Sequence, residues 1–141
     1  MPIDDVDGLV AERLRRNELM NDPVRRWELI HTEGALTWCL GGPTTMVEQM
    51  DHLLVASERP TVDLGIVPAF TPVPFYAHHG FSIHDADVVN IGTRSGTALL
   101  SDSDDIVEYA ELFTQLPQAA VHGDEARALL VALRAEYRAR M

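Results

Sequence analysis

The chain has 141 residues, a hydrophobic fraction of 46% and a formal net charge of −11. This length and composition predict a single domain over residues 1–141 with its own apolar core. The negative charge opposes direct binding to nucleic acid or anionic lipid, and no apolar run is long enough to cross a bilayer.

The types of basic residue and the number of cysteines exclude some catalytic mechanisms and an internal disulfide. All eleven basic residues are arginines, which excludes Schiff-base catalysis through a lysine. Cys39 is the one cysteine, so an internal disulfide is excluded, and the N-terminus lacks the pattern of a secretory signal. These features predict a cytoplasmic protein.

A helix and a strand are predicted first. Apolar residues at helical spacing predict a helix over residues 4–20, which Asn21-Asp22-Pro23 ends. Residues 25–33 alternate in the manner of a strand. One face of that strand carries Trp27, Leu29, His31 and Glu33.

The middle of the chain predicts a long helix and then a second strand. Residues 33–40 fit either a short helix or a strand. Gly41-Gly42-Pro43 opens a helix with a clear apolar stripe, which ends at Arg59-Pro60. A strand follows over residues 62–67, and residues 68–74, with three prolines, form a stiff connection.

The remaining elements are strands followed by helices. Strands are predicted over 81–84 and 88–91, joined by a turn at Asp85-Ala86-Asp87, and residues 93–100 extend the sheet. An acidic N-cap at 101–105 opens a helix that Pro117 ends, and Gly123 opens the last helix. The order predicts an α+β fold, with a small, mainly antiparallel sheet of four to five strands and helices on one face. The other face is open to solvent, a ligand or a second copy in a homodimer.

Several segments together resemble a known family. The most specific set is Glu33-Gly34-Ala35-Leu36, Gly41-Gly42-Pro43, a long helix, Arg59-Pro60 and a valine-rich strand, and the likeness covers nearly the whole chain. On these segments the chain resembles the antitoxin-like domain that follows an XRE-type helix-turn-helix in actinobacterial regulators. The resemblance implies a ligand- or partner-sensing module. The sequence departs from the family in having no helix-turn-helix before this domain, and in Gly92, where the family has an acidic residue.

His31 and Glu33 form the first candidate site. They lie two residues apart on one strand face, where they can exchange protons with a bound molecule. The alternative is structural, with Glu33 bracing the next turn and His31 half-buried and satisfied.

The segment from His78 to Asp87 is the densest polar cluster. His79, His84 and Asp85 are candidate catalytic groups. Metal binding is not predicted, because adjacent His78 and His79 point to opposite sides of an extended chain and the spacing matches no established site. The Asp85-Ala86-Asp87 run is also explained as a turn.

Aromatic residues near these polar groups are candidate ligand contacts. They are Trp27, Trp38, Phe75, Tyr76 and Phe81. Phe75 and Tyr76 are expected in a pocket wall or lid. Cys39, beside Trp38, is expected to be buried and inert.

Two functions remain open from the sequence. The favoured one is a stand-alone small-molecule pocket adapted to acid/base catalysis without a cofactor, as in the cyclisation, isomerisation or dehydration of a polyketide-like specialised metabolite. The alternative is a non-catalytic effector- or partner-binding regulatory module, which includes the excised sensing half of a regulator. A pocket that combines Glu33 or His31 with residues of the 78–87 segment would favour catalysis.

Overall fold

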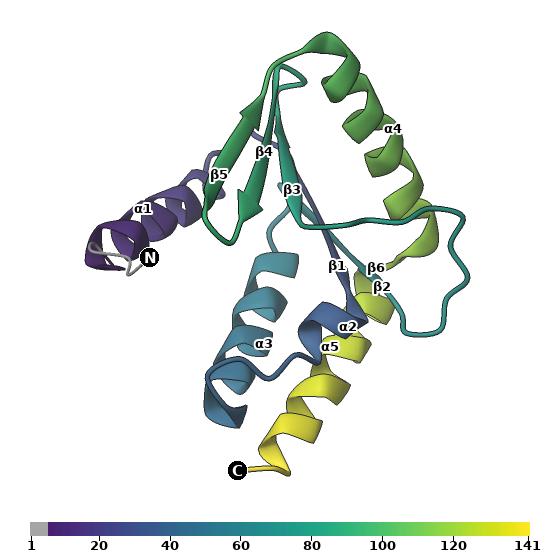
Figure 1. Cartoon of the computed structure of the whole chain (residues 1–141). Helices are drawn as coiled ribbons and strands as arrows, with labels where there is room; N and C mark the ends of the chain where they lie inside the picture. The colour runs from purple at the N-terminus through teal and green to yellow at the C-terminus, as the bar shows by residue number, and fades with distance from the viewer. Residues whose placement is uncertain (1–5) are drawn as a thin grey trace. The chain divides into compact units, whose positions relative to one another are not determined.

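The computed structural model describes residues 6–141. These residues form five helices and six strands, and the strands make two sheets of three (Figure 1). The α+β class is confirmed. The strands divide between two small sheets because residues 71–119 form a meander of their own. The predicted domain thus contains two compact units, Thr71–Ala119 and a second unit made of residues 6–70 and Ala120–Met141.

The larger unit is built on the sheet β1-β2-β6. Strand β1 (Trp27–Thr32) pairs in parallel with β2 (Val62–Val67), and β2 pairs antiparallel with β6 (Val121–His122), a short strand that the sequence pattern did not predict. The parallel pair needs a crossover, which α2 (Glu33–Leu36) and α3 (Pro43–Ser57) supply. The last helix, α5 (Gly123–Arg138), follows β6 directly.

The core of this unit lies where α3 and α5 pack together on one face of the sheet (Figure 1). Met50 of α3, Ile66 of β2 and Leu130 of α5 are fully buried. The side chain of Tyr137, near the C-terminus of α5, borders this core. Its hydroxyl donates a hydrogen bond to the Leu36 carbonyl at 2.7 Å. The C-terminal turns of α5 are thereby fixed to α2.

Gly65 at the centre of β2 allows a close approach of side chains from both neighbouring strands. A Cβ there would lie 2.7 Å from both Cδ1 of Ile30 and Cε1 of His122. A side chain at this position would therefore displace the contacts that cover the strand. On the same sheet, Nδ1 of His122 lies 3.0 Å from an Asp63 carboxylate oxygen.

Helix α1 (Val6–Leu19) differs from the other long helices because none of its residues is buried. Val6, Leu9, Val10 and Leu14 of the predicted apolar stripe are all exposed. The helix is confirmed within the described residues, and Asp4 and Asp5 of the predicted 4–20 range lie outside them. Its charged side chains pair along the helix, as Arg15 does with Glu12 at 2.9 Å.

The smaller unit is an antiparallel meander with one helix. Strands β3 (Phe81–His84), β4 (Val88–Thr93) and β5 (Gly96–Leu100) pair in sequence order, and α4 (Ser103–Ala119) packs against β3 and β4. Val89 and Ile91 of β4 are buried, as is Leu116 of α4. This small core positions the residues considered below.

Two details of the smaller unit test the sequence predictions. The acidic N-cap is confirmed, because Asp102 accepts a hydrogen bond from the Asp104 backbone N–H at 3.0 Å. The prediction that Pro117 ends the helix was wrong, since α4 continues to Ala119. A proline is least disruptive near a helix terminus, where few intrahelical hydrogen bonds remain to be lost.

No helix among residues 6–141 is both long enough and apolar enough to span a membrane.

Candidate functional site

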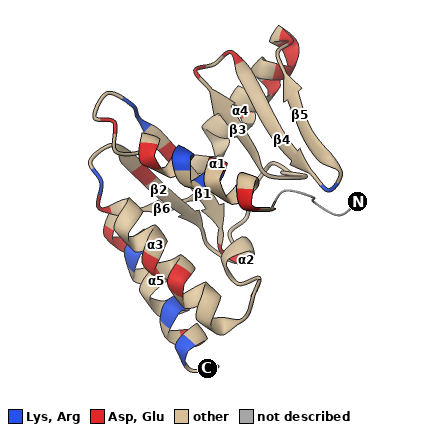
Figure 2. Cartoon of the chain, turned by 90° about the vertical axis from the view of Figure 1, so that its left-hand side faces the viewer, with Lys and Arg blue, Asp and Glu red and all other residues tan. Residues whose placement is uncertain are grey.

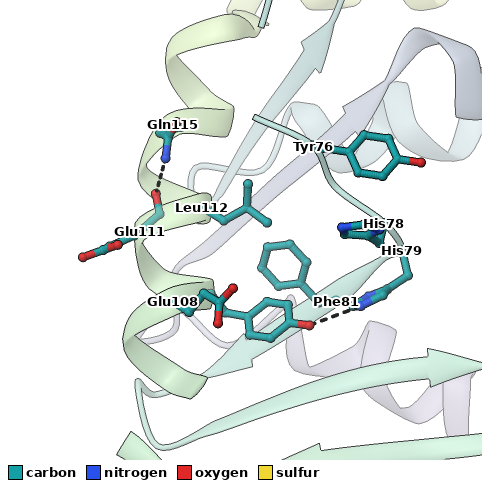
Figure 3. Close-up of a pocket in the computed structure, with 9 residues that line it drawn as sticks. Tyr76, His78, His79, Phe81, Glu108, Glu111, Leu112 and Gln115 are labelled. Atoms are coloured by element: carbon teal, nitrogen blue, oxygen red, sulfur yellow. Dashed lines mark hydrogen bonds between the residues drawn. The ribbon is translucent and has the colours of Figure 1, made fainter. Parts of the chain in front are cut away.

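The smaller unit contains a cavity of about 280 Å³ between α4 and the segment from Tyr76 to Phe81 (Figure 3). Its size is near the lower end for small-molecule sites. Aromatic, imidazole and carboxylate side chains form most of its wall. The lining residues are Tyr76, His78, His79, Phe81, Glu108, Tyr109, Glu111, Leu112 and Gln115.

Both walls follow from local sequence. Glu108, Leu112 and Gln115 recur at helical spacing, which places them along one face of α4. The opposite wall lacks regular structure until β3 begins at Phe81. Pro72 and Pro74 fix their own φ angles and restrain the residues before them, so the backbone is restricted in the segment that leads into this wall.

A hydrogen bond joins the two walls through His79. Nδ1 of His79 lies 3.2 Å from the Gly80 carbonyl oxygen, and Nε2 lies 3.2 Å from the Tyr109 hydroxyl oxygen. When the imidazole is neutral, Nδ1 donates to the carbonyl, which can only accept, and Nε2 accepts from the tyrosine hydroxyl. Figure 3 shows this contact as a dashed line.

Ring contacts hold the aromatic part of the cavity. Phe81 packs edge-on against Tyr109, with ring centroids 4.9 Å apart, and contacts Phe113 at 6.2 Å. Tyr76 and His78 meet edge-on at 4.4 Å on the opposite wall. Such ring pairs stabilise the packing of Phe81 against α4, whereas Tyr76 on the other wall is 76% exposed.

The two glutamates of the lining differ in orientation. In Figure 3 the Glu108 carboxylate lies beside the cavity, whereas the Glu111 carboxylate points away from it. The Glu111 backbone carbonyl accepts a hydrogen bond from the Gln115 amide at 3.4 Å. Glu108 is therefore the carboxylate available to a bound molecule.

The predicted pair His31 and Glu33 belongs to the other unit. Glu33 accepts a hydrogen bond from the Ala69 backbone N–H at 2.6 Å, which fits the bracing role considered for it. His31 is half-buried on β1, and burial lowers its pKa. Neither residue lines the cavity.

The other predicted catalytic groups are divided. The structure brings His79 into the cavity but places His84 and Asp85 elsewhere. Nε2 of His84 contacts the Ser82 hydroxyl at 3.0 Å on β3. Asp85 and Ala86 have φ angles of 52° and 61°, and they form the tight turn that the sequence predicted between β3 and β4.

The predicted aromatic contacts are divided in the same way. Tyr76 and Phe81 line the cavity, whereas Phe75 is half-buried and is not among the lining residues. Trp27 is half-buried on β1, and its Nε1 has no hydrogen-bond partner among the described residues. Trp38 is 70% exposed. The prediction that Cys39 is buried was wrong, because the loop after α2 leaves it exposed.

Sequence reasoning missed the contribution of α4. Tyr109 recurs with Phe113 and Leu116 at helical spacing, which puts it on the apolar stripe of α4, and Glu108 is not among the predicted site residues. The signal lay in the spacing, because Glu108 is adjacent to Tyr109 and four residues before Leu112, at the edge of the stripe. A polar residue at such an edge can line a cavity beside the core.

A second hollow of about 300 Å³ lies in the larger unit, between the end of α1 and α3. Asp51 on its wall accepts a hydrogen bond from Arg134 of α5. This ion pair already engages the Asp51 carboxylate. Within residues 6–141, no group of three or more His, Cys, Asp or Glu side chains is arranged to hold a metal ion.

The fold and the cavity define an α+β domain in which α4 and the Tyr76–Phe81 segment enclose a space of ligand size. The family described as Domain of unknown function (DUF5753) matches residues 1–132, and the chain belongs to that family. No curated protein and no solved structure matches the chain.

Proposed function

We propose that this chain is a small-molecule-binding domain of the sensing type, with its ligand site in the cavity of the smaller unit. The observation that carries this proposal is the cavity of about 280 Å³, where a few polar groups converge among aromatic rings. Binding sites for small molecules commonly combine these features.

The exposure of the site favours reversible binding over catalysis. His78, His79 and Glu108 are exposed to solvent. Acid/base catalysis gains most from a cavity that excludes water, because electrostatic interactions are stronger there. A sensor requires only a difference in ligand affinity between two states.

The biological setting of the proposal comes from the resemblance seen in the sequence. Membership of the DUF5753 family is consistent with a domain of the kind that follows a helix-turn-helix in antitoxin-like actinobacterial regulators. In that setting, effector binding would change the activity of a DNA-binding partner or domain. The effector would enter the cavity between α4 and the Tyr76–Phe81 segment.

A cavity-filling variant tests the proposal. Leu112→Trp places a large ring on the wall of the cavity, and Leu99→Trp is the matched control because Leu99 on β5 is 68% exposed and does not line the cavity. A thermal-shift screen of small metabolites should give ligands that stabilise the wild type and Leu99→Trp but not Leu112→Trp. Circular dichroism verifies that both variants fold. Ligands that stabilise all three proteins equally would place binding elsewhere.

Catalysis without a cofactor remains a second candidate because of the His79–Tyr109 hydrogen bond. A substrate that replaced this hydrogen bond would meet the Nε2 lone pair as a base and the phenolic proton as an acid in one cavity. An isomerisation or dehydration would require both. If the cavity is catalytic, His79→Gln and Tyr109→Phe should each lower turnover by about 100-fold or more without a comparable loss of substrate binding. Equal turnover in these variants would exclude the pair from the chemistry.

A further inference from the structure

We infer that the cavity of the smaller unit recognises a small organic cation, such as a protonated amine carried on an apolar body. This inference rests on the proposed function, because it names the chemical class of the ligand for the same site. Hydrogen-bond acceptors, aromatic rings and the charge of the unit each support it.

The polar groups of the cavity are arranged mainly to accept hydrogen bonds. With a neutral His79 imidazole, the Tyr109 hydroxyl donates its proton to Nε2, and its oxygen retains lone pairs for a ligand N–H. The Nδ1 proton of His79 is donated to the Gly80 carbonyl. The Glu108 carboxylate is acceptor-only when ionised, and it lies beside the cavity (Figure 3). A ligand with several N–H donors complements these groups.

The aromatic lining suits the same ligand. Tyr76, Phe81 and Tyr109 all contribute to the wall. A cation near the face of an aromatic ring is attracted by the ring quadrupole, and the rings also bury the apolar part of the ligand. Carboxylate and aromatic groups together form a recurrent environment for ammonium groups.

The charge of the unit opposes an anionic ligand. Residues 71–119 contain seven carboxylate side chains and one basic residue, Arg94. No lysine or arginine is among the residues that line the cavity. Figure 2 shows acidic residues at the start of α4. A surface of one sign raises the local concentration of ligands of the opposite sign and repels those of the same sign.

Three probes of similar shape but different charge test whether ligand charge, rather than ligand size, determines binding to the cavity. The probes are 2-phenylethylamine, 2-phenylethanol and phenylacetate, which are cationic, neutral and anionic at pH 8. Each is titrated into the full chain at low salt and followed by the amide resonances of residues that line the cavity. Glu108→Gln removes the carboxylate beside the cavity, and Asp104→Asn is the matched control on the same helix, because the exposed Asp104 does not line the cavity.

The amine is expected to bind about fivefold more tightly than the alcohol, and phenylacetate is expected to bind most weakly. Glu108→Gln should remove most of the advantage of the amine, whereas Asp104→Asn should retain it. Equal binding of amine and alcohol at the cavity would overturn the inference and leave the proposed function intact. The absence of any probe-dependent shift at the cavity would overturn the inference, and the metabolite screen with Leu112→Trp would then decide the proposed function separately.

Discussion

The Glu33 side chain accepts a hydrogen bond from the backbone N–H of Ala69, a residue 36 positions later in the chain, at 2.6 Å. Glu33 begins α2 directly after β1, and Ala69 follows β2. The bond therefore connects the segments that leave the carboxyl ends of two parallel strands. Glu33, which the sequence analysis gave as a candidate catalytic group, therefore has a structural hydrogen-bond partner.

This contact predicts the response of Glu33 to substitution. Glu33→Ala should lower the free energy of unfolding by about 1 kcal/mol, because the Ala69 N–H loses a charged acceptor in a partly exposed position. Glu33→Gln should retain most of the stability, since its amide oxygen can still accept. Urea unfolding measures both variants. If neither variant is less stable than the wild type, the hydrogen bond contributes little to folding.

Tyr137 gives a second prediction, through its contact with the last residue of α2. The buried hydroxyl donates to the Leu36 carbonyl at 2.7 Å, and Tyr137→Phe should cost about 1 kcal/mol because that carbonyl loses its donor. Burial also raises the pKa of the phenol. The unfolded chain then ionises first as pH rises, so stability should fall above about pH 10. The free energy of unfolding of Tyr137→Phe should therefore fall less above about pH 10 than that of the wild type, as measured by denaturant titration at several pH values.

His31 gives a prediction at mildly acidic pH. Burial lowers the pKa of its imidazole, so the unfolded chain takes up a proton before the folded chain does. Stability from this group is therefore complete above about pH 6.5 and is lost as pH falls from there towards the folded pKa. The His31 ring resonances should titrate below pH 6.5 in NMR spectra. His31→Gln should show a smaller fall in unfolding free energy between pH 7.5 and pH 5.5 than the wild type.

The sequence predicted most elements because their patterns are local. The alternation after Arg25, the Gly41-Gly42-Pro43 helix start and the turn at Asp85 each depend on neighbouring residues. The sheet arrangement depends instead on pairing between distant segments: β1 pairs with β2 across the helical crossover, residues 71–119 form a separate meander, and β6, a strand of two residues, joins β2 from beyond that meander. A strand that short has no periodicity to detect.

The site could be predicted only in part for a related reason. His79, Tyr76 and Phe81 were found because they are close together in sequence. Glu108 and Tyr109 join them only when α4 packs against β3, a contact between segments that the sequence pattern cannot pair. His31 and Glu33 were attractive because a polar pair at a strand end is typical of functional sites, but polar groups at strand ends also brace loops.

Ala86 provides a test of backbone strain at the hairpin. Its φ of 61° lies in the left-handed region, which glycine adopts more easily than alanine. Ala86→Gly should therefore raise the free energy of unfolding by about 0.5 kcal/mol, after the greater entropy of the unfolded chain is taken into account. Ala110→Gly is the matched control, because this exposed residue lies inside α4 and the same change should destabilise by about 1 kcal/mol. If chemical denaturation shows that Ala86→Gly raises the free energy of unfolding and Ala110→Gly lowers it, the backbone at Ala86 is strained.

The contrast between α1 and α5 leads to the last prediction. Leu130 of α5 is 0% exposed in the core of the larger unit, whereas Leu14 of α1 is 58% exposed. Leu130→Ala should lower the free energy of unfolding by about 3 kcal/mol, because it removes apolar contacts and leaves a cavity. Leu14→Ala, the same substitution on an exposed stripe, should change it by less than about 0.5 kcal/mol. Denaturant titrations of the two variants measure this difference, and a large loss for Leu14→Ala would mean that α1 has a packing partner in solution.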